Sequence, residues 1–524
     1  MKLRSCFTFL KTNWSLCTTL IIVASYGLVL FYIRKDSLWP DGVSYIRIAE
    51  HYASFNFKEA INGYWAPLTS WLMVPLIWIG VQPLYAFWLI NFLATLSILC
   101  FVYWLLRQVL PKIGQVPYFL TLTALGITFM EWSMIDGQHP DALSGYMLLL
   151  VLFYFHKLIK HTTYSHAILL GICLAGLYFS KSIGLYVGLF VLAYVSFKTI
   201  FSKVIPRKFS AVMIFTFLSL TIPWIVLISL KYNHLTISTA ASYNMRLIGP
   251  AQPGHPHVKE SAVLEVKHTD DTWAWDDPSY MTLEEWKPSD HKIYYSALIL
   301  RTLLQISKSF ISISPLLLIS LFVIVYKCKE SQINTILIAI TLLVCAAYSI
   351  TIFEDRYLYI VAIPLIVFGI AQIPKSIWIQ RTFLYVVLAL SMIFASLQIV
   401  PTILNAEQKM YTDSNLKIQS IRAMSYIPKH SVVAGPVERY RTCYFAHLSC
   451  TGLFVLNDGD SVANGAKIET MRSAKIQYYF DYSLPKNLGL QVVYSTESTE
   501  QSCYDYVRDQ HGECPRQYLT IYKL

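Results

Sequence analysis

The sequence is poor in charge. Only 14% of its 524 residues are Asp, Glu, Lys or Arg, whereas soluble domains carry about 25%. Hydrophobic residues make up 55% of the chain, and its mean hydropathy is +0.47. Because these hydrophobic residues occur in long runs, the composition excludes a soluble protein of this size and indicates a protein of the lipid bilayer.

Further features that the sequence lacks narrow the class of membrane protein. Ionised residues are almost missing from the hydrophobic runs, which argues against a transporter or flippase lined by polar groups at mid-membrane. No internal or inverted repeat of the kind found in secondary transporters is visible, and there is no low-complexity tract. No small-residue cleavage site follows the first hydrophobic run, so we interpret that run as a membrane span rather than a signal peptide.

The hydrophobic runs predict about eleven membrane spans. Their centres lie at roughly residues 24, 95, 124, 148, 171, 191, 220, 318, 341, 366 and 392. The net charge of +11 does not indicate nucleic-acid binding, because the cations gather in the short loops on one side of the spans. By the positive-inside rule that side is cytoplasmic, which predicts a cytoplasmic N-terminus and a periplasmic C-terminal region.

Two domains are predicted. Residues 1–402 form the membrane domain, which a long outer loop at 231–297 interrupts, and we expect that loop to cover part of the protein. Residues 403–524 alternate short β-rich runs with helical stretches, which predicts a small mixed α/β domain. We expect a helix at 416–426 and strands at 432–434, 453–456, 476–480, 491–494 and 518–522.

The C-terminal domain contains four cysteines. In an oxidising compartment they permit two disulfides with three possible pairings, and the alternative is four free thiols. The sequence does not choose among the pairings of Cys443, Cys450, Cys503 and Cys514.

The first outer loop places an acid next to the membrane. From residue 44 to 55, hydrophobic residues fall on one helical face and polar residues on the other, which predicts a helix that lies flat on the membrane. Asp41 directly precedes this helix. It is suited to be the N-cap of the helix or to act as a general base, and the two roles are compatible.

More ionisable residues lie on the same side of the membrane. The second outer loop contains Asp136, His139 and Asp141, which either complement the dipole of the next helix or orient an acceptor or bind a metal. Lys181 and Arg356 are placed at outer ends of spans, where the positive-inside rule gives no reason for a cation. They either snorkel to the membrane surface or neutralise the phosphate of a lipid.

In their order and sidedness, these residues resemble the GT-C superfamily of integral-membrane glycosyltransferases, in particular bacterial aminoarabinose transferases and protein O-mannosyltransferases. The resemblance covers essentially the whole membrane domain. The matching elements, in chain order, are Asp41, Gly42 and Tyr45; Tyr64, Trp65, Pro67, Leu68, Trp71 and Leu72; Pro140, Asp141 and Leu143; Gly171, Ala175, Gly176 and Lys181; and Glu354, Arg356 and Tyr357.

The resemblance implies an all-α polytopic membrane protein of the GT-C type, with about eleven transmembrane helices, interfacial helices in the first outer loop and a small C-terminal α/β domain. It also implies inverting transfer of a sugar from a polyprenyl-phosphate donor to lipid A, a surface glycan or a protein, on the outer face of the inner membrane. Asp41 is then the base. The implied substrate-binding residues are Tyr64, Asp136, His139, Asp141, Lys181, Glu354, Arg356 and Tyr357.

One departure from the family pattern concerns metal binding. The first loop has a single acid at the motif rather than a pair, although Asp36 lies five residues earlier. We expect no metal and no other cofactor, because basic groups can stabilise a leaving phosphate. The alternatives to a transferase are a transporter or flippase of lipid-linked sugars and a scaffold whose C-terminal domain binds a partner.

Overall fold

The structure is a computed structural model of the chain. It describes residues 12–111, 114–134, 138–202, 204–252, 272–372, 385–386, 406–436, 439–456, 461–482, 486–495 and 519–524. The chain divides into two compact units, which are described separately. The helical unit comprises Met1–Tyr32, Ile61–Met245 and Trp286–Pro401, and the mixed unit comprises Ile33–Ala60, Arg246–Glu285 and Thr402–Leu524. The mixed unit thus includes two segments from within the predicted membrane domain.

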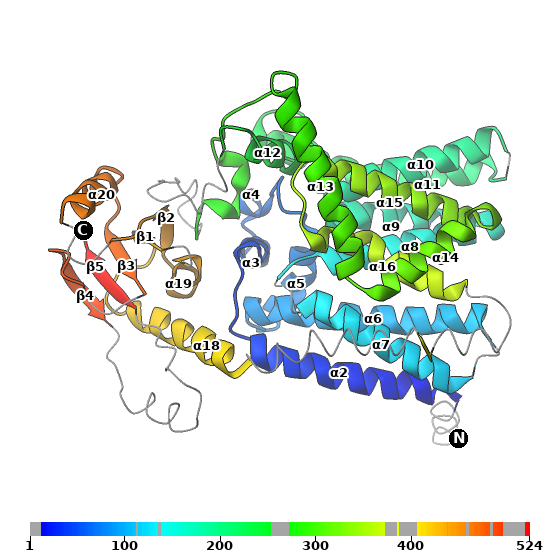
Figure 1. The fold of residues 1–524 in the computed structure, drawn as a ribbon, viewed down its shortest axis with the longest axis horizontal. Coiled ribbons are helices and arrows are strands. Elements are labelled where there is room, and N and C mark those ends of the chain that lie inside the picture. Colours follow the sequence, from blue (N-terminus) through cyan, green and yellow to red (C-terminus); the bar gives the residue numbers. More distant parts are fainter. Residues whose placement is uncertain are drawn as a thin grey trace. The chain divides into compact units, whose positions relative to one another are not determined.

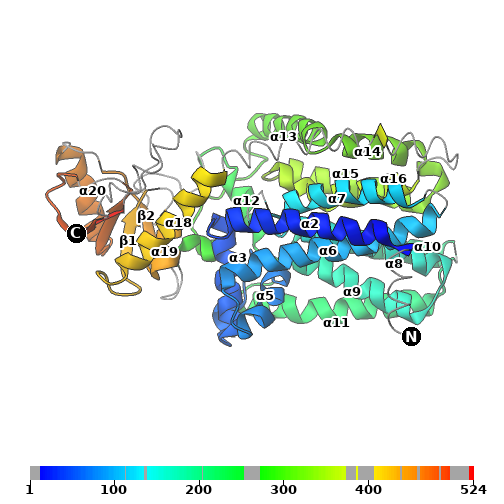
Figure 2. The same ribbon diagram turned by 90° about the horizontal axis from the view of Figure 1, so that it is seen from below.

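The helical unit is a bundle of apolar helices that run side by side (Figures 1 and 2). Its elements are α2 (Trp14–Arg34), α5 (Leu68–Trp78), α6 (Pro83–Val109), α7 (Gln115–Met134), α8 (Asp141–Lys160), α9 (Tyr164–Ser180), α10 (Ile183–Ile200), α11 (Arg207–Tyr232), α12 (Ala240–Leu247), α13 (Lys292–Ser312), α14 (Pro315–Tyr326), η4 (Cys328–Glu330), α15 (Gln332–Ser349), η5 (Asp355–Leu358) and α16 (Tyr359–Ala371).

Six of the described helices are long and apolar enough to cross a membrane, namely α2, α6, α8, α10, α11 and α15. The pair α13 and α14, bent by 104° at its break, is a seventh if it forms one span. Each predicted span centre from 24 to 366 falls within one of the described helices. The span predicted near residue 392 lies outside the described residues.

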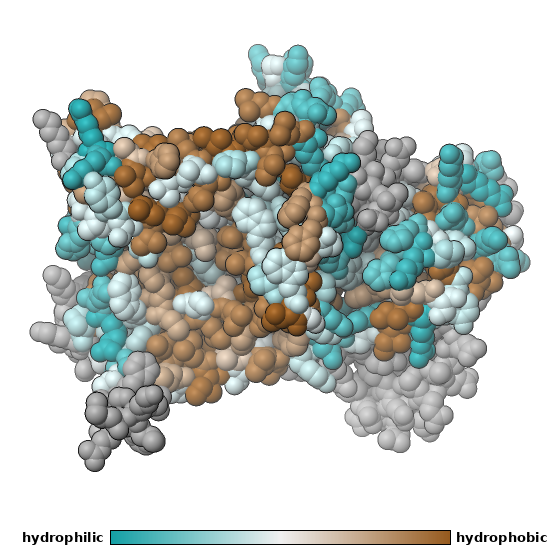
Figure 3. Space-filling view, turned by 180° about the vertical axis from the view of Figure 1, so that it is seen from behind, coloured by the Kyte–Doolittle hydropathy of each residue, from teal (hydrophilic) through white to brown (hydrophobic). Residues whose placement is uncertain are grey.

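The bundle exposes hydrophobic side chains. On the face shown in Figure 3, such residues gather over the helical unit, and large apolar side chains such as Phe215 and Phe322 are exposed. Exposing this apolar surface to water would cost about 25 cal/mol of free energy per Å², whereas contact with the equally apolar lipid tails carries no such cost. The chain is therefore an integral membrane protein, as its composition predicts.

Glycines let the helices of the bundle approach closely. A Cβ atom added at Gly145 in α8 would lie 2.5 Å from the backbone oxygen of Tyr359 in α16, and one at Gly171 in α9 would lie 2.8 Å from that of Met213 in α11. Small residues at helix crossings allow this backbone contact in membranes. The crossing at Gly145 brings the first turns of α8 against the start of α16, directly after η5.

Gly145→Ala is expected to lower the melting temperature of the detergent-solubilised protein, because the added methyl group meets rigid backbone and overpacking costs about 1–3 kcal/mol. The matched control is Gly188→Ala in α10, where the added Cβ would lie an ordinary 3.5 Å from the Phe217 ring. Equal melting temperatures for the two variants would contradict the close crossing of α8 and α16.

The mixed unit contains a five-stranded sheet with the order β2-β1-β3-β5-β4. β1 is parallel to β2 and β3, and β5 is antiparallel to β3 and β4. The elements of this unit are α3 (Pro40–Ala53), α4 (Phe57–Ala60), η2 (Ala274–Asp276), η3 (Pro278–Tyr280), α18 (Ala406–Ala423), β1 (Val432–Gly435), α19 (Arg439–Ala446), β2 (Ser449–Leu453), α20 (Ser461–Ser473), β3 (Tyr478–Asp481), β4 (Gln491–Ser495) and β5 (Thr520–Lys523). The predicted mixed α/β domain is confirmed.

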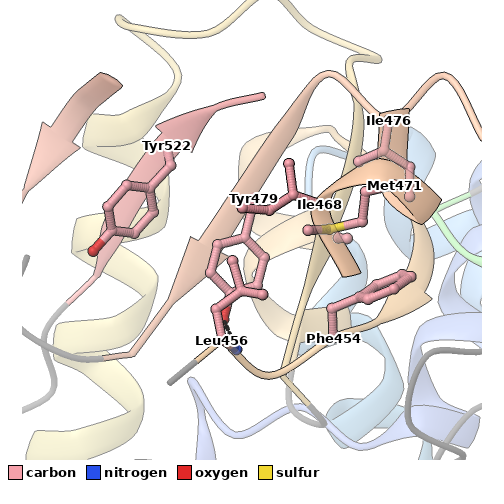
Figure 4. Close-up of a cluster of buried hydrophobic side chains, with 8 residues drawn as sticks. Phe454, Leu456, Ile468, Met471, Ile476, Tyr479 and Tyr522 are labelled. Atoms are coloured by element: carbon pink, nitrogen blue, oxygen red, sulfur yellow. Dashed lines mark hydrogen bonds between the residues drawn. The ribbon is translucent and has the colours of Figure 1, made fainter. Parts of the chain in front are cut away.

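One predicted strand is displaced. The second strand is Ser449–Leu453, not 453–456. The hydrophobic residues behind the wrong prediction, Phe454 and Leu456, follow the strand and lie in the buried core with Tyr479, whose hydroxyl accepts a hydrogen bond from the Leu456 N–H at 3.1 Å (Figure 4). The run therefore lies mostly beyond the strand, where its buried side chains fill the core, although the Phe454 N–H still donates to the Gly435 backbone oxygen at 3.1 Å.

The structure contains the disulfide Cys443–Cys450, which joins α19 to β2. It belongs to one of the three pairings that the sequence allows. Cys503 and Cys514 lie outside the described residues.

Candidate active site

An ionic cluster in the helical unit is centred on Asp141. This residue lies in the first turn of α8, Lys181 directly follows α9, and Arg356 lies in η5, between α15 and α16. The Lys181 ammonium donates a hydrogen bond to Asp141 Oδ1, and Arg356 Nε lies 4.0 Å from Asp141 Oδ2. Arg356 Nε also donates to Glu354 Oε2 at 2.7 Å. With Tyr357, whose ring lies against both cations, the structure brings together five of the predicted site residues.

The cluster is mostly shielded from water. The side chain of Asp141 is 5% exposed and those of Lys181 and Arg356 are 18% and 14% exposed, whereas Glu354 is 48% exposed. The ring centroid of Tyr357 lies 3.8 Å from Lys181 Nζ and 5.5 Å from Arg356 Cζ. A cation near the face of an aromatic ring is attracted by the ring quadrupole. Two cations therefore share one buried carboxylate, and the second carboxylate is accessible.

Local backbone structure fixes the positions of these groups. Gly184 permits the tight turn between α9 and α10, because a Cβ there would lie 2.2 Å from the Leu177 backbone oxygen. Lys181 occupies that turn with an extended backbone. Pro140 is the N-cap of α8, which leaves Asp141 in the first helical turn. A carboxylate is favoured there by the helix dipole.

Asp141→Asn is expected to destabilise the ligand-free protein, because it leaves the Lys181 ammonium buried without its carboxylate. Breaking a buried ion pair typically costs about 3–5 kcal/mol. Thermal unfolding in detergent measures the effect. The double variant Asp141→Asn with Lys181→Met is expected to recover part of the loss; a double variant less stable than the single one would contradict the importance of the pair.

Three predicted residues are placed elsewhere or are not described. Tyr64 belongs to an aromatic group near α12: its hydroxyl donates to Asn244 Oδ1 at 3.1 Å, and its ring lies 5.4 Å from that of Tyr243. His139 lies two residues before α8 and is half-buried. Asp136 lies outside the described residues.

In the mixed unit, Asp41 is not the N-cap of its helix. The N-cap of α3 is Trp39, and Pro40 is the first helical residue, a position that suits the fixed φ and missing N–H of proline. Asp41 lies one residue further, and its Oδ1 accepts a hydrogen bond from the indole Nε1 of Trp275 at 3.0 Å. The N-cap interpretation is therefore wrong, and a tryptophan of the long loop is the carboxylate's neighbour.

The predicted polar face of α3 contacts protein. Ser44 Oγ donates to the Trp275 backbone oxygen at 2.9 Å, and Arg47 Nη1 donates to Glu50 Oε2 at 2.5 Å. The hydroxyl of Tyr444, in α19, donates to Glu50 Oε1 at 3.3 Å. The predicted helix is confirmed, with the bounds Pro40–Ala53 rather than 44–55, but helical periodicity alone does not reveal these long-range partners. The flat position of α3 on the membrane stays a prediction.

Asp36 is engaged in an ion pair. It accepts hydrogen bonds from Lys417 Nζ at 2.6 Å and Ser414 Oγ at 2.7 Å, both in α18. Burial alone raises the pKa of Asp36, but these hydrogen bonds outweigh it, and the net pKa lies below its ordinary value. Within the described parts of the chain, no three His, Cys, Asp or Glu residues are grouped to hold a metal ion.

Similar solved structures share the fold and little sequence. The oligosaccharyltransferase of Archaeoglobus fulgidus, in a complex with Zn and sulfate, is similar over 88% of this chain and 67% of that chain, with a TM-score of 0.50 and 11% identity. ArnT from Cupriavidus metallidurans, bound to undecaprenyl phosphate, is similar over 96% of this chain and 97% of that chain, with a TM-score of 0.49 and 11% identity. The first likeness shows that the fold is the GT-C fold predicted from the sequence.

By sequence, no protein-family model matches the chain, and no curated protein matches it significantly.

Proposed function

We propose that the chain is an inverting glycosyltransferase that moves a sugar from a polyprenyl-phosphate donor to an acceptor on the outer face of the inner membrane. The observation that carries this proposal is the buried cluster in which Lys181 and Arg356 share Asp141 at one end of the bundle. A lipid phosphate at that end would meet a bidentate guanidinium and an ammonium in a site of low dielectric. The GT-C fold supports the proposal by supplying a lipid-facing bundle.

In the proposed reaction, Asp41 acts as the general base. Its carboxylate takes the proton from a hydroxyl or amine of the acceptor, the freed electron pair forms a bond to the anomeric carbon, and the bond from that carbon to the phosphate oxygen breaks. Lys181 and Arg356 stabilise the charge that develops on the leaving polyprenyl phosphate. Attack opposite the leaving group inverts the anomeric centre, and no metal takes part.

The roles of the predicted site residues that contact Lys181 and Arg356 follow from where they lie relative to these two cations. Glu354 and Tyr357 hold the two cations in place, and Asp141 neutralises them while the donor is absent. An incoming phosphate must compete with the carboxylates, and the half-exposed Glu354 is the easier one to displace. We assign the three remaining predicted residues to binding of the sugar or acceptor: Tyr64, Asp136 and His139.

The charge distribution and the disulfide support the proposed orientation. Lys157 and Lys160 lie in the last turn of α8, at the end opposite Asp141, and the positive-inside rule makes that end cytoplasmic. The disulfide between Cys443 and Cys450 is typical of an oxidising compartment such as the periplasm. Both observations favour a periplasmic C-terminal domain and an outer-facing cluster.

The test in cells is mass spectrometry of lipid A, surface glycans and secreted proteins, with and without the gene. One of these molecules is expected to lose a sugar, and the wild-type gene, but not one encoding Asp41→Asn, is expected to restore it. A flippase would need transport but no general base, so the Asp41→Asn gene could still restore the sugar. Restoration by Asp41→Asn would therefore contradict the proposal. An unchanged envelope in cells shown to make the protein would also contradict it.

A further inference from the structure

Trp275 contacts α3 at two points. Its indole N–H donates to Asp41 Oδ1 at 3.0 Å, and its backbone oxygen accepts from Ser44 Oγ at 2.9 Å. Residues three apart on a helix lie on the same face, so both contacts are made from one side of α3. Trp275 itself is buried. Two contacts with one buried residue fix the direction in which the Asp41 carboxylate is held.

The short helix η2, which carries Trp275, is itself held by the sheet. Asp276 Oδ2 accepts from the backbone N–H groups of Thr272 and Trp273, at 2.7 and 3.4 Å. The N–H of Cys450 in β2 donates to the Thr272 backbone oxygen at 2.8 Å, and Trp273 forms a parallel β-bridge with Cys450. Because β2 is an edge strand, residues 272–273 extend the sheet in the way that a bound peptide does.

The helix α19 supports the same arrangement from a second direction. Its Cys443 is disulfide-bonded to Cys450, and both are buried. The ring of Tyr440 lies 5.1 Å from that of Trp273, and the Tyr440 hydroxyl donates to the Leu38 backbone oxygen at 3.4 Å, just before α3. A continuous set of contacts therefore leads from the disulfide through residues 272–273 to the carboxylate.

We infer that Trp275 is a positioning residue for the proposed base Asp41, and that strand β2 and the Cys443–Cys450 disulfide hold Trp275 in place. This inference rests on the proposed function. The C-terminal domain thereby contributes to catalysis without touching the reacting atoms. A hydrogen bond to a carboxylate stabilises its charged form and fixes its orientation.

The kinetic test is Trp275→Phe, which keeps an aromatic ring and removes the N–H donor. The turnover number is expected to fall about 10- to 100-fold, as for loss of a charge-assisted hydrogen bond, with KM for the donor within about twofold of the wild-type value. The acidic limb of the rate profile is expected to move to higher pH, because the carboxylate now loses its proton less readily. Trp286→Phe is the matched control, since its indole donates to a backbone oxygen, that of Met245.

A spectroscopic test does not depend on turnover. In protein labelled with 5-fluorotryptophan, the ¹⁹F signal that disappears in Trp275→Phe is expected to shift with pH as Asp41 titrates. Asp41→Asn is expected to remove that step. Asp276 is a second nearby carboxyl: burial raises its pKa to about 6, and Arg47 and the Thr272 N–H oppose that rise. Asp276→Asn is the control for this group, and we expect this variant to keep the pH-dependent shift of the ¹⁹F signal.

Three other ionisable residues lie on the elements packed around this site, and none of the variants changes them: Arg47 and Glu50 on α3 and Tyr444 on α19.

The outcomes separate this inference from the proposed function. A folded wild-type protein without transferase activity refutes the proposed function. An active wild type whose Trp275→Phe variant keeps both its turnover number and its pH profile refutes only the positioning role. A ¹⁹F step that survives Asp41→Asn also refutes it. If the double variant Cys443→Ala with Cys450→Ala folds and turns over at the wild-type rate, the disulfide has no part in positioning.

Discussion

Asp41→Asn is expected to abolish release of polyprenyl phosphate from a labelled sugar donor, with turnover lowered by at least about 100-fold, as for loss of a general base. Asn keeps the size of the side chain and an oxygen that can accept from the Trp275 indole, but its amide cannot take a proton. The fold and the affinity for the donor should therefore persist. Turnover is measured with purified protein, and binding with the unlabelled carrier.

The matched control for this prediction is Asp36→Asn. Asp36 is a nearby acid engaged with Lys417 and Ser414, so its loss is expected to lower thermal stability while leaving the turnover number unchanged. If Asp36→Asn abolished turnover while Asp41→Asn retained it, the roles of the two acids would be reversed. Undiminished turnover in Asp41→Asn would remove Asp41 as the base.

Arg356→Ala is expected to weaken binding of the polyprenyl-phosphate donor by about 10- to 100-fold, as for loss of a hydrogen bond between charged groups. Arg356 is 14% exposed and lies with Lys181 about the same carboxylate, so its removal takes away half of the positive charge offered to a phosphate. A binding titration with the radiolabelled carrier measures the loss.

Arg356→Lys is the informative companion variant. It keeps the charge but not the planar fork of the guanidinium, and we expect an affinity between those of the wild type and of Arg356→Ala. An unchanged donor affinity in Arg356→Ala would show that the cluster is a structural ion pair only, and the phosphate-binding role would be withdrawn.

Local patterns in the sequence predicted much of the fold. Hydrophobic run length located α2, α6, α8, α10, α11 and α15, and α3 follows the helical periodicity of 44–55. β1, β3, β4 and β5 coincide with predicted β-rich runs. These features depend on residues that are close in the sequence, so one amino-acid sequence is enough to predict them. The strand β2 was misplaced because its own residues are mostly small or polar and its hydrophobic neighbours serve the core.

The candidate site was predicted only in part. Membrane sidedness placed Asp141, Lys181 and Arg356 on the outer side of the membrane domain, but only the structure shows that these three residues meet. Sidedness did not reveal that Asp141 is the partner of Lys181, because 40 residues separate the two in the sequence. Trp275 falls within the predicted outer loop at 231–297, and no local pattern links it to Asp41, since their contact spans 234 positions. Contacts of such separation follow from tertiary packing, which composition and periodicity do not encode.

The most direct measurement follows a donor labelled in both its sugar and its polyprenyl phosphate, added to the periplasmic-equivalent side of sealed proteoliposomes together with an extract of envelope acceptors. We expect the purified protein to separate the two labels, with the sugar transferred to an acceptor and the polyprenyl phosphate released, and Asp41→Asn to leave them joined. Movement of the intact donor across the bilayer with both labels still joined would contradict a transferase.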